Sequence, residues 1–204
     1  MDRAAQPRAL LVLGHGAGGG PQAPDLALLA RRLPPLGVGV ARFEQPWRLA
    51  GRKVAVRPPQ LDEAWLEAVP WLRGPSGPAG LGQVALYAGG RSAGARVACR
   101  TADTLDVRGV VCLAFPLHLP GRPERSRAAE LLAPSVPRLV LQGSRDTFGG
   151  TAEVAAAVAG PPGVRLVDLP GADHGYRLAR GAAWSAADLR ETLVAEVSRF
   201  LAGE

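Results

Sequence analysis

Three side chains, Ser92, Asp146 and His174, are of the types that together carry out nucleophilic catalysis. A serine hydroxyl becomes a good nucleophile when a neighbouring imidazole accepts its proton. A carboxylate then holds that imidazole in the useful tautomer and stabilises its charged form. The three residues are far apart in the sequence, so their chemistry depends on the elements that position them.

Short apolar runs alternate with longer segments of helical character along the whole chain. Most of the runs are continuously apolar, which is typical of strands covered by helices on both faces of a parallel sheet. We predict strands over 9–14, 38–43, 83–88, 109–115, 138–143 and 164–169, and helices over 25–33, 60–72, 93–105, 124–132, 151–160 and 186–201. This alternation predicts an α/β fold, with a mostly parallel, doubly wound sheet of about six strands between two helical layers.

In such a sheet, chemistry is performed beyond the carboxyl ends of the strands. Ser92 lies there, in the pattern Gly90-x-Ser92-x-Gly94 between a predicted strand and a predicted helix. This pattern is typical of a sharp, strained turn that exposes a serine, and it would aim the backbone N–H of Ala93 at a developing oxyanion. Asp146 and His174 each follow a later strand, in the chain order expected for this kind of sheet.

Each of the three residues also has a plainer interpretation. Ser92 could cap the helix that begins at Ala93, Asp146 could stabilise its own turn, and His174 could be an ordinary loop residue. Asp173 and Asp168 are weaker candidates for the acid, because the first is adjacent to His174 and the second lies inside a strand.

The composition sets limits on the class of protein. At 204 residues with 47% hydrophobic residues, the chain is expected to form a single domain over 1–204. The net charge of +6 comes from scattered arginines without a basic stripe, which argues against nucleic-acid binding. No membrane-spanning run or secretion signal is recognisable, so a cytoplasmic location is expected. Cys99 and Cys112 are expected to be buried free thiols, and no spacing predicts a metal site or another cofactor.

The chain contains the motifs 13-LGHGAGG-19, 89-GGRSAGAR-96, 115-FPLHLPGRP-123, 141-LQGSRDTFG-149 and 171-GADHGY-176. On these motifs it resembles the α/β-hydrolase superfamily. Within it, the chain is most similar to a small group that includes dienelactone-hydrolase-like bacterial proteins, testis-expressed hydrolase-like proteins and a related subunit of a nuclear histone acetyltransferase complex. The resemblance implies Ser92 as nucleophile, Asp146 as acid and His174 as base. It also implies an oxyanion hole formed by the backbone amides of Ala17 and Ala93.

The chain departs from larger members of that superfamily in two ways. The first predicted strand begins almost at the N-terminus, so we expect the two opening strands of larger members to be absent. Only about twenty residues separate the fourth predicted strand from the fifth. Larger members place a lid between those strands. We therefore expect no cap domain, and an open, shallow site.

Five further residues are candidates for substrate binding at this site: His15, Arg91, His118, Phe148 and Tyr176. His15 is also expected to order the oxyanion loop through a hydrogen bond, and Arg91 is also expected to tie down a neighbouring loop. Phe148 and Tyr176 would wall the site beside the acid and the base.

The stretch 14-GHGAGGG-20 also matches G-x-G-x-x-G, the pattern of a dinucleotide-binding loop. Such a loop leads directly into a helix, whereas here 20-GPQAP-24 intervenes. The interpretation favoured by the residues is a serine hydrolase that cleaves small-molecule carboxylic esters through an acyl-enzyme, with lactones or thioesters as alternative substrates. A catalytically weak or inactive interaction module with this fold is the alternative, and a dinucleotide-binding oxidoreductase is less favoured.

Overall fold

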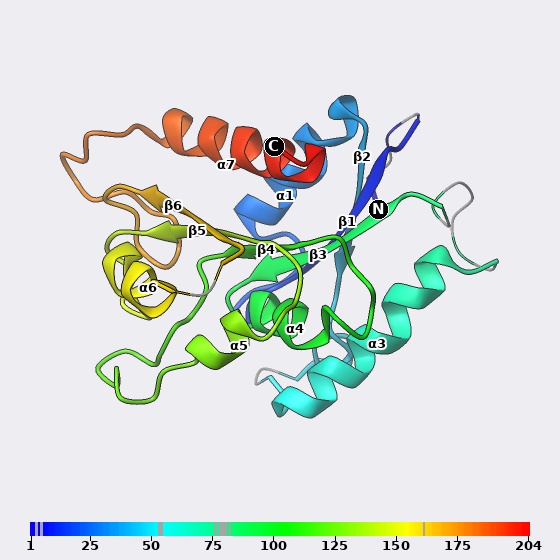
Figure 1. Cartoon of the computed structure of the whole chain (residues 1–204), viewed down its shortest axis with the longest axis horizontal. Helices are drawn as coiled ribbons and strands as arrows, with labels where there is room; N and C mark the ends of the chain where they lie inside the picture. The colour runs from blue at the N-terminus through cyan, green and yellow to red at the C-terminus, as the bar shows by residue number, and fades with distance from the viewer. Residues whose placement is uncertain are drawn as a thin grey trace.

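The core of the molecule is one sheet of six parallel strands, in the order β2-β1-β3-β4-β5-β6 (Figure 1). The computed structural model describes residues 1–204 except 3, 5, 53, 54, 76, 78–80, 82 and 161. The strands are β1 (Ala9–Gly14), β2 (Val38–Phe43), β3 (Ala85–Arg91), β4 (Val110–Leu113), β5 (Arg138–Gly143) and β6 (Val164–Leu169). Because all six are parallel, their carboxyl ends meet at one edge of the sheet, as the sequence predicts.

Helices cover both faces of this sheet and give the molecule three layers (Figure 1). One face carries α1 (Pro24–Arg32) and α7 (Ala186–Ala202). The other carries α3 (Pro58–Arg73), α4 (Ala93–Thr101), α5 (Ala128–Leu132) and α6 (Thr151–Ala157). A short helix, α2 (Pro46–Leu49), and a 3₁₀ turn over Pro34–Leu36 complete the described helices. The predicted doubly wound α/β fold is confirmed.

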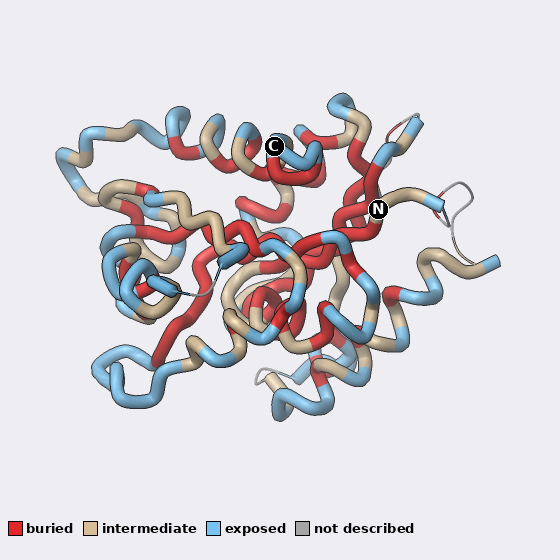
Figure 2. Tube along the Cα trace, in the orientation of Figure 1, coloured by how far each residue is buried: buried red, intermediate tan, exposed pale blue. Residues whose placement is uncertain are grey.

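The hydrophobic core lies in two layers, one on each side of the sheet. Every residue of β1, β4 and β5 is buried, which explains why these strands are continuously apolar in the sequence. Figure 2 shows the buried strands at the centre and the exposed outer sides of the helices. In α7, the buried residues Leu189, Leu193, Val194, Val197 and Leu201 form the apolar stripe that the sequence shows.

The predicted boundaries differ from the structure mainly in the helices. The helix predicted over 93–105 ends at Thr101, whose hydroxyl donates to the carbonyl of Val97, and the chain then turns into the loop before β4. The helix predicted over 124–132 begins only at Ala128. No pattern in the sequence predicts α2, because four residues are too few to show a helical period.

Three glycines allow β1 to touch the turn between β3 and α4. A Cβ atom on Gly90 would lie 2.6 Å from the carbonyl oxygen of Gly14, and a Cβ on Gly94 would overlap the same carbonyl group. Real side chains cannot come so close to a backbone. The glycines of Gly90-x-Ser92-x-Gly94 are therefore required because two backbone segments pack directly against each other.

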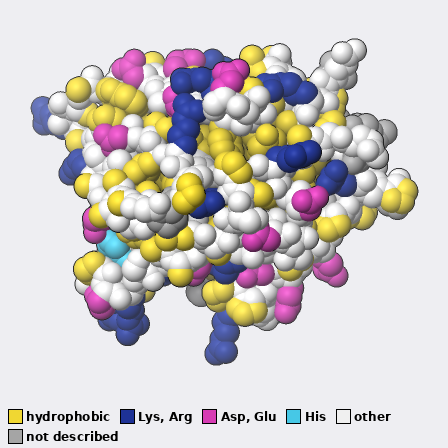
Figure 3. Space-filling model, in the orientation of Figure 1, with side chains coloured by type: hydrophobic (Ala, Val, Ile, Leu, Met, Phe, Trp, Pro, Cys, Tyr) yellow, Lys and Arg dark blue, Asp and Glu magenta, His cyan; other side chains and the backbone are white. Residues whose placement is uncertain are grey.

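The molecular surface shows no wide region of one charge on the face drawn in Figure 3, where basic and acidic side chains are interspersed. No helix in the described part of the chain is long and apolar enough to cross a membrane.

The glycine contact gives a direct test of the fold. Gly94→Ala should lower the free energy of unfolding by about 3 kcal/mol or more, because the new methyl group would force β1 away from α4. Gly160→Ala is the matched control, because a Cβ there meets no atom within 4 Å. Its effect should stay within about 1 kcal/mol. Urea denaturation measures both, and equal stability of the two variants would contradict the contact.

Candidate active site

Ser92 stands on a strained turn at the carboxyl end of β3. Its backbone has φ 51° and ψ −112°, a conformation that costs a residue other than glycine free energy. The turn is held by the N–H of Ser92, which donates to the carbonyl of Leu113 at 2.9 Å, and by the glycine contact with β1. The strained turn thus places the Ser92 side chain above the sheet, directly before α4.

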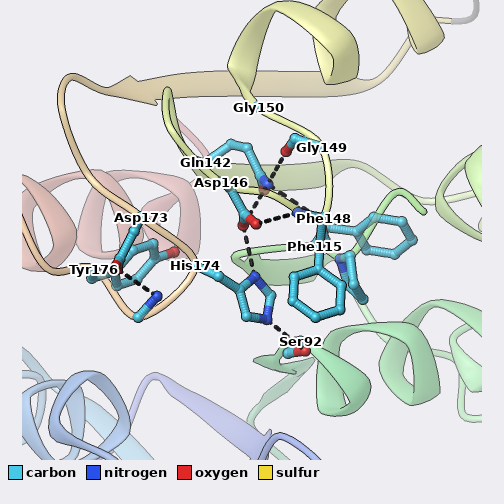
Figure 4. A network of polar contacts seen from close by, with 12 residues as sticks. Ser92, Phe115, Gln142, Asp146, Phe148, Gly149, Gly150, Asp173, His174 and Tyr176 are labelled. Carbon is cyan, nitrogen blue, oxygen red and sulfur yellow. Dashed lines mark hydrogen bonds and ion pairs between the residues drawn. The ribbon is translucent and has the colours of Figure 1, made fainter. Parts of the chain in front are cut away.

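The structure brings the three predicted residues together. The His174 ring lies between the other two side chains, with Nε2 2.9 Å from Oγ of Ser92 and Nδ1 2.7 Å from Oδ2 of Asp146 (Figure 4). The carboxylate can only accept, so Nδ1 carries the proton and Nε2 is free to accept from the serine hydroxyl. This is the arrangement in which imidazole can remove a proton from Ser92.

Asp146 is enclosed by donors. Its side chain is fully buried, and besides His174 it accepts from the N–H of Phe148 at 2.8 Å and from Nε2 of Gln142 at 3.0 Å. These donors provide hydrogen-bond partners for a carboxylate that is buried away from the surface. They also fix the direction in which Oδ2 faces the imidazole.

Gln142 is a site residue that the sequence analysis did not identify. It is fully buried in β5, and its Nε2 also lies 3.2 Å from the carbonyl of Phe115 and 2.6 Å from that of Gly149. With three acceptors around Nε2, the opposite orientation of the amide would set oxygen against oxygen. A polar residue in the otherwise apolar end of 138-RLVLQG-143 was the available signal.

Arg91 fixes the loop that carries His174. Its Nη1 donates to the buried carboxylate of Asp25 at 2.7 Å, and its Nη2 donates to the carbonyl of His174. Its guanidinium also lies 5.3 Å from the ring centre of Tyr176, whose hydroxyl donates to the carbonyl of Leu141 at 2.7 Å. Arg91 and Tyr176 are therefore engaged inside the protein, and the loop role expected for Arg91 matches these contacts.

Phe148 packs directly on the base. Its ring centre lies 4.3 Å from that of His174 with the planes tilted by 32°. The two other acids near His174 have different partners. Asp173 accepts from the N–H groups of Gly175 and Arg177 in its own loop, and Asp168 accepts from the hydroxyl of Thr151. Only Asp146 among the three contacts the imidazole.

The loop after β1 lies beside Ser92. A Cβ on Gly16 would be 3.5 Å from Cβ of Ser92, and Ala17 and Ala93 line the same small recess. Within the described part of the chain, the N–H groups of Ala17 and Ala93 donate no hydrogen bond. Two unengaged amides on either side of a serine are what an oxyanion hole requires.

His15 organises this loop from inside the protein. Its Nδ1 lies 2.8 Å from the carbonyl of Gly16, and its Nε2 accepts from the N–H of Gln45 at 3.2 Å. The ring is buried and packs against Trp47. Burial lowers the pKa of His15, which agrees with a neutral imidazole that must accept at Nε2. These contacts match the ordering role expected for His15 and engage both of its ring nitrogens inside the protein.

His118 is likewise engaged elsewhere. Its Nδ1 lies 2.9 Å from the carbonyl of Leu119, its Nε2 lies 3.0 Å from a carboxylate oxygen of Glu153, and its side chain is almost fully buried. Of the five residues predicted to bind substrate, Phe148 packs against the ring of His174, and its side chain forms no hydrogen bond.

The site is reachable from solvent. His174 keeps 22% of its side chain exposed, and the segment between β4 and β5 contributes only a loop and the short α5 (Figure 1). In the described residues, no group of three or more His, Cys, Asp or Glu side chains could hold a metal ion. Cys99 and Cys112 are buried free thiols, with their sulfurs 3.5 Å apart.

Solved structures show the same fold. A serine hydrolase homologue from Coxiella burnetii superimposes with a TM-score of 0.74 at 22% identity, over 95% of this chain and 88% of that chain. A serine hydrolase without a lid from Xanthomonas campestris gives 0.70 at 22% identity, over 97% and 84%. Est1E from Butyrivibrio proteoclasticus, with ferulic acid bound, gives 0.73 at 15% identity, over 96% and 90%.

The sequence itself matches a family model described as alpha/beta hydrolase domain, over residues 7–202. The match covers nearly the whole chain, including the turn at Ser92 and the loops that carry Asp146 and His174. The chain therefore belongs to the alpha/beta hydrolase domain family.

Proposed function

We propose that this protein is a serine hydrolase that cleaves small carboxylic esters through an acyl-enzyme. The observation that carries the proposal is the His174 ring, which is hydrogen-bonded at once to Oγ of Ser92 and to Oδ2 of Asp146. Nothing in partner binding alone requires this set of contacts, so they favour catalysis over the alternative of an inactive interaction module.

In the proposed reaction, Oγ of Ser92 attacks the ester carbonyl while Nε2 of His174 takes its proton. The amides of Ala17 and Ala93 stabilise the negative charge on the carbonyl oxygen. His174 then returns the proton to the leaving alcohol as the C–O bond breaks, which leaves an acyl group on Ser92. Water, activated by the same imidazole, releases the carboxylic acid and restores the serine.

The space beside the loop that follows β1 is of a size that favours a small substrate. A cleft of about 440 Å³ adjoins it, and Ala17, Gly18, Trp47 and Arg48 are among the residues that line it. The segment between β4 and β5 contains only loops and the short α5, which is little chain from which to build a lid over a long acyl group. Within the family, we further propose membership of the dienelactone-hydrolase-like and testis-expressed hydrolase-like group, which is supported only by the motifs that carry the resemblance.

The proposal of a serine nucleophile is tested with a fluorophosphonate probe. We expect the folded protein to be labelled with one probe per chain, and Ser92→Ala to remain unlabelled at unchanged stability. Labelling is measured by intact-protein mass spectrometry. A native protein that stays unlabelled while folded would favour the non-catalytic module.

The role of the carboxylate is tested by Asp146→Asn. This change keeps the size of the side chain but removes the acceptor that holds Nδ1–H of His174, so we expect kcat to fall by about 10³- to 10⁴-fold. Asp168→Asn is the matched control, because that exposed carboxylate accepts from the hydroxyl of Thr151 and does not contact His174. Steady-state assays with a p-nitrophenyl ester compare the two variants, and equal activity would show that Asp146 is not the acid.

The open site predicts the acyl-chain preference. In a series of p-nitrophenyl esters, kcat/KM should be highest for short acyl groups of about two to four carbons, because no lid buries a longer chain. A rise in kcat/KM with chain length up to long acyl groups would contradict the small-ester proposal without affecting the assignment of Ser92.

A further inference from the structure

A second cavity lies at the opposite end of the sheet from Ser92. Its volume is about 410 Å³, and its walls come from the starts of β4, β5 and β6 together with the C-terminal end of α7. Tyr87, near the start of β3, lines it, whereas Ser92 follows the end of the same strand. Five residues of extended strand separate them by about 16 Å. The catalytic proposal uses no residue of this cavity.

The cavity combines an apolar wall with a polar group that lacks a partner. Tyr87 and Phe200 meet edge to face with ring centres 6.0 Å apart, and Pro137 and Val164 also line the space. Tyr87 is only 9% exposed, yet its hydroxyl forms no hydrogen bond within the described part of the chain. The hydroxyl oxygen itself is not fully buried, so it can be reached from the cavity. A ligand there can accept a hydrogen bond from it.

The charges around the cavity are mainly positive. Arg108, Arg138 and Arg165 line it, opposed among the lining side chains by Glu204. Arg165 is neutralised by Glu196 at 2.6 Å, but Arg108 has no ion pair with any described residue. Figure 3 shows hydrophobic side chains gathered near the centre of this face, beside the C-terminal end of α7, with basic side chains around them.

Among the arginines that line the cavity, Arg138 is unusual because its guanidinium is buried. The residue is 4% exposed, and its nitrogens donate to the carbonyls of Pro134, Val136 and Pro162. Its Nε has no partner, and no described carboxylate pairs with the group. Buried charges in proteins are normally paired, so an anion near this end of the sheet would provide the missing counter-charge.

We propose that this cavity binds a small amphipathic anion, with its apolar body against Phe200, Pro137 and Val164 and its carboxylate at Arg108 and the Tyr87 hydroxyl. The volume lies within the range of small-molecule sites. An aliphatic carboxylate fits this chemistry, because its two oxygens accept from a guanidinium and a hydroxyl while its chain covers the apolar wall.

Octanoate and its neutral counterpart 1-octanol are the probes, measured by isothermal titration calorimetry on the whole protein. Ser92→Ala should bind one octanoate with the same Kd as the native protein. Arg108→Gln should weaken binding by about tenfold, and Tyr87→Phe by about threefold or more, through loss of a charge-assisted and a hydroxyl hydrogen bond. Octanol should bind at least about tenfold more weakly than octanoate.

Arg190→Gln is the matched control, because it removes an exposed arginine near the start of α7, far from the cavity at the other end of that helix. It should leave Kd unchanged, and the thermal midpoints of all variants should match the native protein. Three results would overturn the proposal: no saturable binding, equal affinity for octanoate and octanol, or octanoate protecting Ser92 from a fluorophosphonate without sensitivity to Arg108→Gln.

Discussion

The close approach of two backbones at Gly14 and Gly94 is the constraint on which the rest of the site depends. Because no side chain separates β1 from the start of α4, the turn at Ser92 lies directly beside the loop that follows β1. The same approach sets Gly16 against Ser92 and places Ala17 and Ala93 around one recess. A single packing contact thus positions both the proposed nucleophile and its proposed oxyanion donors.

The base and the acid are held by a separate set of contacts. Asp146 is fixed by Gln142 and by the N–H of Phe148, while the backbone of His174 is fixed by Arg91, which is itself held by Asp25. A buried ion pair such as Arg91–Asp25 adds little net stability after its desolvation cost. Its contribution here is positional, because it restrains the exposed loop that carries the imidazole.

The sequence predicts the strands well and the supporting side chains poorly, for a physical reason. Continuous apolar runs and the residues after them are local patterns, so the six strands and the positions of Ser92, Asp146 and His174 could be read directly. Gln142 and Asp25 act through partners brought close only by the folded sheet. A polar residue in an apolar run marks Gln142 as unusual, but no local pattern shows what either residue contacts. Substrate binding is predicted for His15, Arg91, His118 and Tyr176 from their places after strands, but their orientation toward internal partners depends on packing that a sequence does not show.

The covalent intermediate is the most direct test of the central claim, that Ser92 acts as a nucleophile activated by His174. The native protein is mixed with p-nitrophenyl butyrate, quenched in acid within the first turnover and digested for peptide mass spectrometry. The account predicts one butyryl group on the peptide that contains Ser92, and none after His174→Ala. A native protein that releases p-nitrophenol with no acyl group on Ser92 would contradict it.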